Sequence, residues 1–171
     1  PGQGRILDFC AGGGGKALAI ADRTEARILA HDAVARRMTD LPARAARAGI
    51  DIACLAPGAA ARGGPYDAVL VDVPCSGSGT WRRDPEAKWR LEPARLDALC
   101  QAQAGILDAA QALVRPGGLL VYMTCSLLPR ENEGQIDAFR QRRSEWRLAA
   151  TRLDTPLTAS DGFYTAVLDR G

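Results

Sequence analysis

The segment Arg5–Ala21, RILDFCAGGGGKALAIA, predicts how the chain folds. Arg5–Phe9 is a short apolar run typical of a buried strand, and Ala11–Gly15 is a glycine turn. Lys16–Ala21 then carries a helical pattern. A strand, a glycine turn and a helix in this order open a nucleotide-binding βαβ unit. The segment therefore favours an α/β fold built on a mostly parallel sheet.

The same alternation continues along the rest of the chain. Further strands are expected at Arg27–Ala30, Asp51–Leu55, Ala68–Val73, Leu119–Thr124, Trp146–Ala150 and Phe163–Leu168, and helices at Ala33–Ala48, Glu92–Val114 and Pro129–Arg143. Pro42 should kink or break the first of these helices, and Arg115–Gly118 should end the second. Strands that alternate with helices predict a doubly wound sheet of about seven strands.

Length and composition set broad limits on function. The chain has 171 residues, and residues 1–171 are expected to form a single domain. Its content of 47% hydrophobic and 25% charged residues is ordinary for a soluble domain. A net charge of +2 neither demands nor excludes a polyanionic partner. No apolar run approaches the roughly 20 residues of a membrane span, and no signal peptide is recognisable. The expectation is a cytoplasmic catalytic core whose natural N-terminal part lies outside this sequence.

The cysteines indicate free thiols rather than a disulfide framework or a metal site. Their number is odd, no Cys-x-x-Cys pair occurs, and His31 is the only histidine. Three of them, Cys10, Cys54 and Cys100, are expected to be buried structural cysteines, the commonest role of this residue. Free thiols in a reducing cytoplasm are therefore predicted, with no metal bound.

The glycine turn and two acids suggest the kind of ligand. The turn is not a P-loop, because Cys10 and Ala17 stand where that motif needs Gly and Ser or Thr. Asp32, at the end of the second strand, is placed to accept ribose hydroxyls. Asp8, at the end of the first, could meet an ammonium group. This combination fits S-adenosylmethionine better than a dinucleotide; the alternative is a glycine turn used for packing beside a surface Asp32.

The segment Asp67–Trp89, DAVLVDVPCSGSGTWRRDPEAKW, places an acid and a thiol at one strand end, as Asp72 and Cys75. A second thiol, Cys125, closes a later strand in Thr-Cys-Ser. If the two strands are neighbours, both thiols open into one crevice beside the first strand. No histidine is available to form a thiolate, so a lowered thiol pKa would need backbone N–H groups, Lys16 or the cofactor sulfonium.

These motifs resemble the Nol/Nop/Sun (RsmB-like) family of S-adenosylmethionine-dependent RNA cytosine-5 methyltransferases. The resemblance covers nearly the whole chain: LDFCAGGGGK, the segment Asp67–Trp89, LVRPGGLLVYMTCSLLPRENE and DGFYTAVLDR. DNA cytosine-5 methyltransferases share a Pro-Cys motif, but the Thr-Cys motif is not expected in them. The resemblance implies a Rossmann-like class I methyltransferase fold with a closing antiparallel strand.

Residue roles follow from the resemblance by position. Cys125 would be the nucleophile and Cys75 the thiol that assists release of the product. Asp72 would hold the cytosine edge, with Lys16 in the same site. The residues that would line the cofactor are Cys10, Ala11, Gly12, Gly13, Gly14, Gly15, Lys16, Asp32 and Asp72. The implied cofactor is S-adenosylmethionine, with S-adenosylhomocysteine as its product, and the partner is RNA, ribosomal in the first place and transfer RNA in the second.

The implied chain is a monomer without membrane contact, and the family's RNA-binding segment would precede residue 1. Two departures from the family pattern stand out. Gly13 replaces a proline and Gly12 an alanine of the usual glycine motif. The stretch 54–57, after the third strand, offers no acid near the adenine.

Basic residues after Cys75 are compatible with phosphate contacts. The cluster comprises Arg82, Arg83, Lys88, Arg90 and Arg95, interleaved with Trp81 and Trp89. The alternative is a solvated helix entry balanced by Asp84, Glu86 and Glu92. A second cluster is expected to be a solvated face: Arg140, Arg142, Arg143 and Arg147.

Two other functions stay open from the sequence. The chain could be a non-catalytic methyltransferase-fold module that binds RNA as a ribosome assembly factor, as the two departures suggest. A nicotinamide-dependent oxidoreductase would also suit a glycine turn, but the pair Cys75 and Cys125 has no function there.

Overall fold

The computed structural model describes residues 4–158 and 161–171. The chain forms two compact units, described in turn: the first comprises Pro1–Asp72 and Ala110–Leu120, the second Val73–Ala109 and Val121–Gly171. Within the described ranges no helix is both long and apolar enough to cross a membrane.

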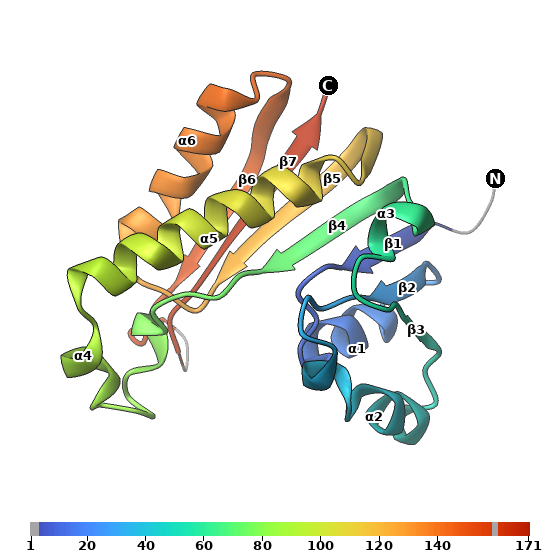
Figure 1. Ribbon diagram of the computed structural model, residues 1–171, viewed down its shortest axis with the longest axis horizontal. Helices are drawn as coiled ribbons and strands as arrows, with labels where there is room; N and C mark the ends of the chain where they lie inside the picture. The colour runs from blue at the N-terminus through green and yellow to red at the C-terminus, as the bar shows by residue number, and fades with distance from the viewer. Residues whose placement is uncertain (1–3, 159–160) are drawn as a thin grey trace. The chain divides into compact units, whose positions relative to one another are not determined.

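Seven strands form one sheet in the order β3-β2-β1-β4-β5-β7-β6 (Figure 1). The strands are β1 (Arg5–Asp8), β2 (Arg27–Ala30), β3 (Ile52–Cys54), β4 (Tyr66–Asp72), β5 (Val114–Thr124), β6 (Trp146–Asp154) and β7 (Phe163–Arg170). β1 pairs in parallel with β2 and β4, β2 pairs in parallel with β3, and β6 and β7 are antiparallel. The expected α/β fold with a mostly parallel sheet and a closing antiparallel strand is confirmed.

The helical segments lie between these strands. They are α1 (Gly15–Ala21), α2 (Leu41–Ala48), α3 (Ala60–Gly63), α4 (Ala87–Arg90), α5 (Pro93–Gln111) and α6 (Glu133–Arg142), with short 3₁₀ turns η1 (Ala35–Met38), η2 (Ser78–Thr80) and η3 (Pro129–Glu131). The sequence did not predict the short segments α3, α4 and η2.

The core of the first unit lies on its central strands. Leu7, Ile28 and Val69 are almost completely buried, as expected for apolar runs in a parallel sheet. α1 contacts β2 and β3, and α2 contacts β3 (Figure 1). Each buried aliphatic side chain stabilises the fold by about 1.5–3 kcal/mol. This packing fixes the C-terminal ends of β1 and β2, which carry Asp8 and Asp32.

The core of the second unit forms around the β6–β7 hairpin. β7 alternates inward and outward side chains, and Tyr164, Ala166 and Leu168 are buried. Trp146 of β6 is buried with Phe139 of α6, with ring centroids 6.1 Å apart. Hairpin and helix therefore form a packed support for the end of β5.

Several expected elements differ in the structure. α5 ends at Gln111, so Arg115–Gly118 lie within β5 and do not end the helix, and β6 continues beyond Ala150 to Asp154. The helix expected at 33–48 is split into η1 and α2, and Pro42 lies in the first turn of α2, where its missing N–H costs nothing. β5 begins at Val114, not Leu119, and Gly117 adopts a φ of +69° inside the strand. The helix expected from Pro129 is interrupted at Asn132, where φ is −111° and ψ is −105°. The Asn132 side chain donates to the Ser126 carbonyl.

The expectation of three buried structural cysteines is wrong for Cys54, which is exposed because the edge strand β3 ends there. Cys10 and Cys100 are half-buried. All five cysteines are free thiols.

Candidate active site and its relatives

The glycine turn of the first unit requires glycine at two positions. Gly12 and Gly14 adopt φ values of +51° and +76°, which other residues rarely take. A Cβ atom on Gly14 would also lie 2.1 Å from Leu41 Cδ1. Gly13, where the family has proline, has no positive φ, and its carbonyl oxygen accepts a hydrogen bond from Arg44. The turn is thus anchored despite its four glycines.

Asp32 holds the same turn from the end of β2. Its side chain is buried, and Oδ2 accepts the Gly12 N–H at 3.1 Å while Oδ1 accepts the Val34 N–H at 2.8 Å. The alternative of a surface Asp32 is therefore wrong. The carboxylate stabilises the turn directly and keeps lone pairs beyond those that the two backbone groups use.

Three charged side chains meet beside the turn. Lys16 Nζ lies 2.5 Å from Asp72 Oδ2, so the two residues expected to share a site do so. Asp8 is 2% exposed, and its Oδ1 has no hydrogen-bond partner among the described residues. Burial and then the neighbouring Asp72 raise the pKa of Asp8 to about 7, against the opposing charge of Lys16. A buried acid with an unpartnered oxygen is suited to a positively charged ligand.

These groups face one cavity of about 370 Å³, within the about 300–1,000 Å³ typical of ligand pockets. Its lining residues are Asp8, Cys10, Ala11, Gly12, Gly13, Gly15, Lys16, Arg44 and Asp72. Seven of the nine expected cofactor residues line this cavity, and Gly14 and Asp32 do not. Gly14 belongs to the turn and packs against Leu41, whereas Asp32 accepts the Gly12 N–H.

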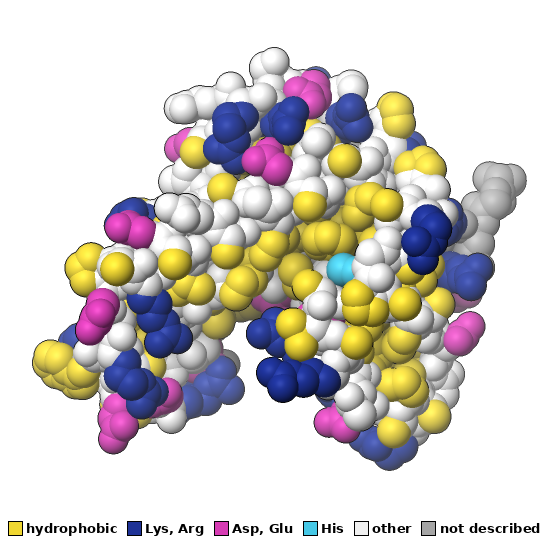
Figure 2. All heavy atoms as spheres, viewed as in Figure 1, with side chains coloured by type: hydrophobic (Ala, Val, Ile, Leu, Met, Phe, Trp, Pro, Cys, Tyr) yellow, Lys and Arg dark blue, Asp and Glu magenta, His cyan; other side chains and the backbone are white. Residues whose placement is uncertain are grey.

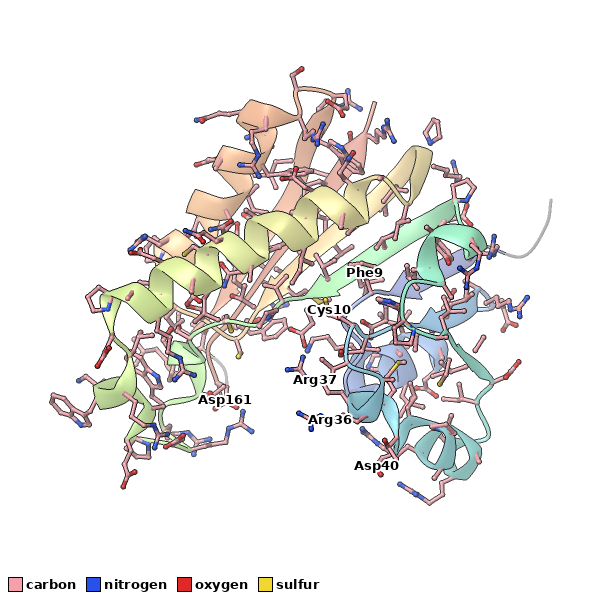
Figure 3. All side chains as sticks on the ribbon, in the orientation of Figure 1. Phe9, Cys10, Arg36, Arg37, Asp40 and Asp161 are labelled. Carbon is pink, nitrogen blue, oxygen red and sulfur yellow. The ribbon has the colours of Figure 1, made fainter. Side chains whose placement is uncertain are left out.

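Cys10, labelled in Figure 3 just after β1, lines this cavity as a protonated thiol. Burial and the charge of Asp8 raise its pKa to about 12. Arg44 was missed by the sequence analysis, because one arginine in an Arg-rich helix carries no distinguishing signal. The cavity suits a ligand that carries both a positively charged group and a carboxylate. Asp8 Oδ1 can accept from the positive group, and the Arg44 guanidinium can bind the carboxylate.

The second unit brings the two strand-end thiols together. Cys75 Sγ and Cys125 Sγ lie 3.2 Å apart, although 50 residues separate them along the chain. Both side chains are half-buried. The two thiols lie together, as expected; that they open into one crevice, and that Asp72 joins them there, stay predictions.

Each thiol influences the ionisation of the other. The hydrogen bond to Cys125, then burial, raises the pKa of Cys75. Two thiols in contact do not ionise independently, since each thiolate disfavours the other. Either sulfur can donate the hydrogen bond that joins them.

A buried carboxylate, Glu131, bonds to the residue after each thiol. Its Oε1 accepts the Ser76 backbone N–H at 2.8 Å, and its Oε2 accepts the Ser76 and Ser126 hydroxyls at 2.5 and 2.6 Å. Gln103 of α5 donates to Glu131 Oε1 and to the Pro74 carbonyl, both at 3.0 Å. The sequence analysis quoted Glu131 within the motif ENE without a role; only the fold shows what it contacts.

Asn132 fastens the end of β5. Its side-chain N–H donates to the Ser126 carbonyl at 2.9 Å, and its Oδ1 accepts the Thr124 hydroxyl at 2.6 Å. This is why the backbone at Asn132 departs from helical geometry before α6 begins. The loop after Cys75 is equally constrained, because a Cβ atom on Gly79 would lie 2.3 Å from the Gly162 carbonyl oxygen.

The basic cluster divides into two parts. Arg82 and Arg83 lie 3.6 and 3.1 Å from Asp161, labelled in Figure 3, so both are paired. Figure 2 shows basic and acidic side chains mixed around α4, and Arg90 pairs with Asp84 at 2.7 Å. This part fits the alternative of a balanced, solvated helix entry.

The rest of the segment is different. Trp89 is 82% exposed, and Lys88 Nζ lies 5.3 Å from the centre of its ring. A surface cavity of about 240 Å³ is lined by Ser76, which follows Cys75, by Arg95, and by the paired Arg90 and Asp84. In the second basic cluster, all four arginines lie within 4 Å of acids, as a solvated face requires. Among the described residues no group of three or more His, Cys, Asp or Glu side chains could hold a metal ion.

Comparisons with known proteins bear on this arrangement. The chain is 42% identical over 149 residues to ribosomal RNA small subunit methyltransferase B of Xanthomonas campestris, covering 82% of this chain and 34% of the relative. It is 36% identical to the protein of the same name from Vibrio vulnificus, and the match covers 95% of this chain and 41% of that relative. The chain thus spans about a third to two fifths of the length of these curated relatives.

Two crystal structures have the same fold throughout. The structure of PH0851 is 32% identical with a TM-score of 0.89, covering 99% of this chain and 43% of that one. The structure of NSun6 from Pyrococcus horikoshii with SFG is 26% identical with a TM-score of 0.83, and the match covers 96% of this chain and 47% of that one. The sequence model for "16S rRNA methyltransferase RsmB/F" matches residues 2–168. The chain therefore belongs to the RsmB/F family of ribosomal RNA methyltransferases.

Proposed function

We propose that this chain transfers a methyl group from S-adenosylmethionine to carbon 5 of a cytosine in ribosomal RNA, through a covalent cysteine–cytosine adduct. The observation that carries the proposal is the contact of the Cys75 and Cys125 sulfurs at 3.2 Å. Membership of the RsmB/F family supports an RNA substrate. The names of the curated relatives support the small-subunit ribosomal RNA.

Cys125 is the nucleophile in this proposal. Carbon 5 of cytosine is a weak nucleophile, and addition of the Cys125 sulfur to carbon 6 makes it enamine-like. The contact between the two sulfurs supports a shared role, since a thiol at Cys75 can donate a hydrogen bond to the Cys125 sulfur. Asp72, paired with Lys16, is proposed to hold the cytosine edge and stabilise the charge that addition places in the ring.

Cys75 serves the second half of the reaction. After methyl transfer, the proton on carbon 5 must leave so that the bond from carbon 6 to Cys125 can break. Cys75, beside Cys125, is proposed to take that proton as a thiolate, after its own proton has passed to solvent. The target base cannot be reached while it is stacked, so it must be unpaired or flipped out.

The cavity of the first unit is the proposed cofactor site. When bound, S-adenosylmethionine supplies an electrophilic methyl group and leaves as S-adenosylhomocysteine. Asp8 would meet the cationic end of the ligand, and Asp32 would both hold the turn and accept a ribose hydroxyl. The related NSun6 structure with SFG, an S-adenosylmethionine analogue, supports this choice.

RNA beside the target base is proposed to contact the surface around Trp89. An exposed indole gives an unpaired base a stacking platform, worth about 1–3 kcal/mol per base. Arg95 and Arg90 line the same cavity as Ser76, which follows Cys75, and can contact phosphates there. The bonds of Arg90 to Asp84 and Glu86 are between exposed groups and worth little, so a phosphate can replace them.

The direct test uses the purified chain, small-subunit ribosomal RNA and labelled S-adenosylmethionine, with digestion to nucleosides and mass spectrometry. The proposal predicts 5-methylcytidine with the native chain and none with Cys125→Ala. Label at another atom of cytosine, or on another base, would contradict it.

A non-catalytic RNA-binding module is the second candidate, because no acid follows β3 near the expected adenine position. Calorimetric titration of the folded chain with S-adenosylmethionine separates the two: undetectable binding would favour the module. A monomeric, cytoplasmic enzyme acting as one domain over residues 1–171 remains part of the first proposal.

A further inference from the structure

Two segments that meet only in the folded chain carry the thiols. Cys75 follows β4, Cys125 closes β5, and 50 residues lie between them. Sulfur atoms in contact at 3.2 Å require both segments to be held in place. Each thiol is followed by a serine, Ser76 or Ser126, whose hydroxyl bonds to a residue outside its own loop.

We infer that Glu131 is a positioning residue that holds the Cys75 and Cys125 sulfurs in register. Its carboxylate is fully buried and joins Ser76 to Ser126 through one oxygen, at 2.5 and 2.6 Å. The inference rests on the proposed function, in which both thiols act on one base. Glu131 acts on the thiols through Ser76 and Ser126, to which its carboxylate is hydrogen-bonded.

The donors explain why a carboxylate stands here. Four hydrogens point at Glu131: the Ser76 N–H, the hydroxyls of Ser76 and Ser126, and the side-chain N–H of Gln103. A carboxylate accepts all four, and bonds to a charged acceptor are about twice as strong as neutral ones. A glutamine would direct its own N–H₂ at the two hydroxyls instead.

Ser126 has little capacity to accept that amide. Its Oγ already accepts the Leu128 N–H at 3.0 Å and contacts Ser78 Oγ at the same distance. Glu131→Gln therefore keeps the side-chain volume but loosens the link between the two thiol segments. The consequence falls on the separation of the sulfurs, while the cavity of the first unit keeps all its own residues.

The test measures sulfur proximity without using the methylation reaction. Diamide oxidises two thiols to a disulfide and takes up their two electrons and two protons; peptide mapping by mass spectrometry then quantifies the Cys75–Cys125 linkage over time. For Glu131→Gln we expect this linkage to form about tenfold more slowly, as for a loss of one charge-assisted hydrogen bond. The kcat for methylation should fall by a similar factor, with the KM values for RNA and S-adenosylmethionine unchanged.

Tyr122→Phe is the matched control, because it removes one buried hydrogen bond, from Tyr122 to the Glu131 backbone carbonyl at 2.6 Å, and leaves the carboxylate contacts intact. It should lower the unfolding midpoint and leave the disulfide rate as in the native chain. If Glu131→Gln is folded and crosslinks at the native rate, Glu131 does not position the thiols and the inference is wrong.

Two smaller variants keep the test decisive if Glu131→Gln does not fold. Ser76→Ala and Ser126→Ala each remove one hydroxyl that bonds to Glu131, so each should slow the crosslink by a smaller factor. Native crosslinking in both would overturn the inference. Should the native chain crosslink quickly but methylate nothing, the proposed function fails while the crosslinking result still decides the role of Glu131.

Discussion

Asp8 and Glu131 are both buried carboxylates at the ends of strands or just beyond them, yet their surroundings are opposite. Glu131 is 0% exposed and receives four hydrogen bonds. Asp8 is 2% exposed, and one of its oxygens has no partner within the described ranges. The difference indicates that a buried acid whose oxygens are all hydrogen-bonded stabilises the fold, whereas a buried acid with an unbonded oxygen facing a cavity is suited to bind a ligand.

The largest expected effect is on stability, and it differs in sign between the two acids. Glu131→Ala leaves the Ser76 N–H and the Gln103 amide without their acceptor and opens a cavity, so it should cost about 3–5 kcal/mol of unfolding free energy. Asp8→Asn removes a buried charge and should stabilise the chain at pH 8. Urea unfolding of both variants at pH 8 measures the change in unfolding free energy. An equal decrease in both variants would contradict the proposed difference between Asp8 and Glu131.

The pH dependence of stability tests the same contrast through Asp8 alone. Its pKa is raised from 3.8 in the unfolded chain to about 7 in the folded one, so between these values the native state retains a proton that the unfolded state has lost. Stability contributed by Asp8 is therefore full below about pH 4 and is lost as the pH rises to about 7, by up to about 4 kcal/mol. The stability difference between Asp8→Asn and the native chain should grow over this range; a constant difference would contradict the raised pKa.

Cofactor binding should follow the ionisation of Asp8. A cationic ligand binds the ionised carboxyl, so affinity for S-adenosylmethionine should rise with pH up to about 7, by at most about tenfold per unit, and then level off. Asp8→Asn should bind more weakly with no such rise. Titration calorimetry from pH 5.5 to 7.5 measures both, and parallel profiles for the two proteins would exclude Asp8 as the contact.

The smallest expected effect is on RNA affinity, away from both acids. Trp89→Ala should raise the KM for RNA about 5–150-fold, as for the loss of one stacked base, and leave kcat unchanged. Arg147→Ala, which removes an arginine paired with Asp169 at 2.9 Å, is the control and should change neither. Similar KM values for the two variants would place the RNA contact elsewhere.

The sequence predicted the fold and which candidate site residues come together, because both depend on local patterns. Apolar runs and glycine turns placed the strands, and Cys75 and Cys125 stood out at two strand ends. The expected pairing of Lys16 with Asp72 is also present, at 2.5 Å. Such features are visible whenever a residue type is unusual for its local context.

The supporting contacts could not be predicted, because they join segments far apart in the chain. Glu131 reaches Ser76 across 55 residues, Gln103 reaches Pro74 across 29, and Arg44 reaches the glycine turn across 31. Hydrogen bonding also overrode local propensity at Asn132, where the expected helix breaks. Cys54 was misplaced for a related reason, since burial depends on which strand lies at the sheet edge.

The most direct test of the account is the fate of the covalent adduct when each thiol is removed. Cys75→Ala keeps the nucleophile and loses the thiol that assists release, so a denaturant-resistant protein–RNA band should accumulate on incubation with ribosomal RNA and S-adenosylmethionine. Cys125→Ala should give no band. A band of equal intensity with both variants, or one with Cys125→Ala alone, would contradict the roles given to the two sulfurs.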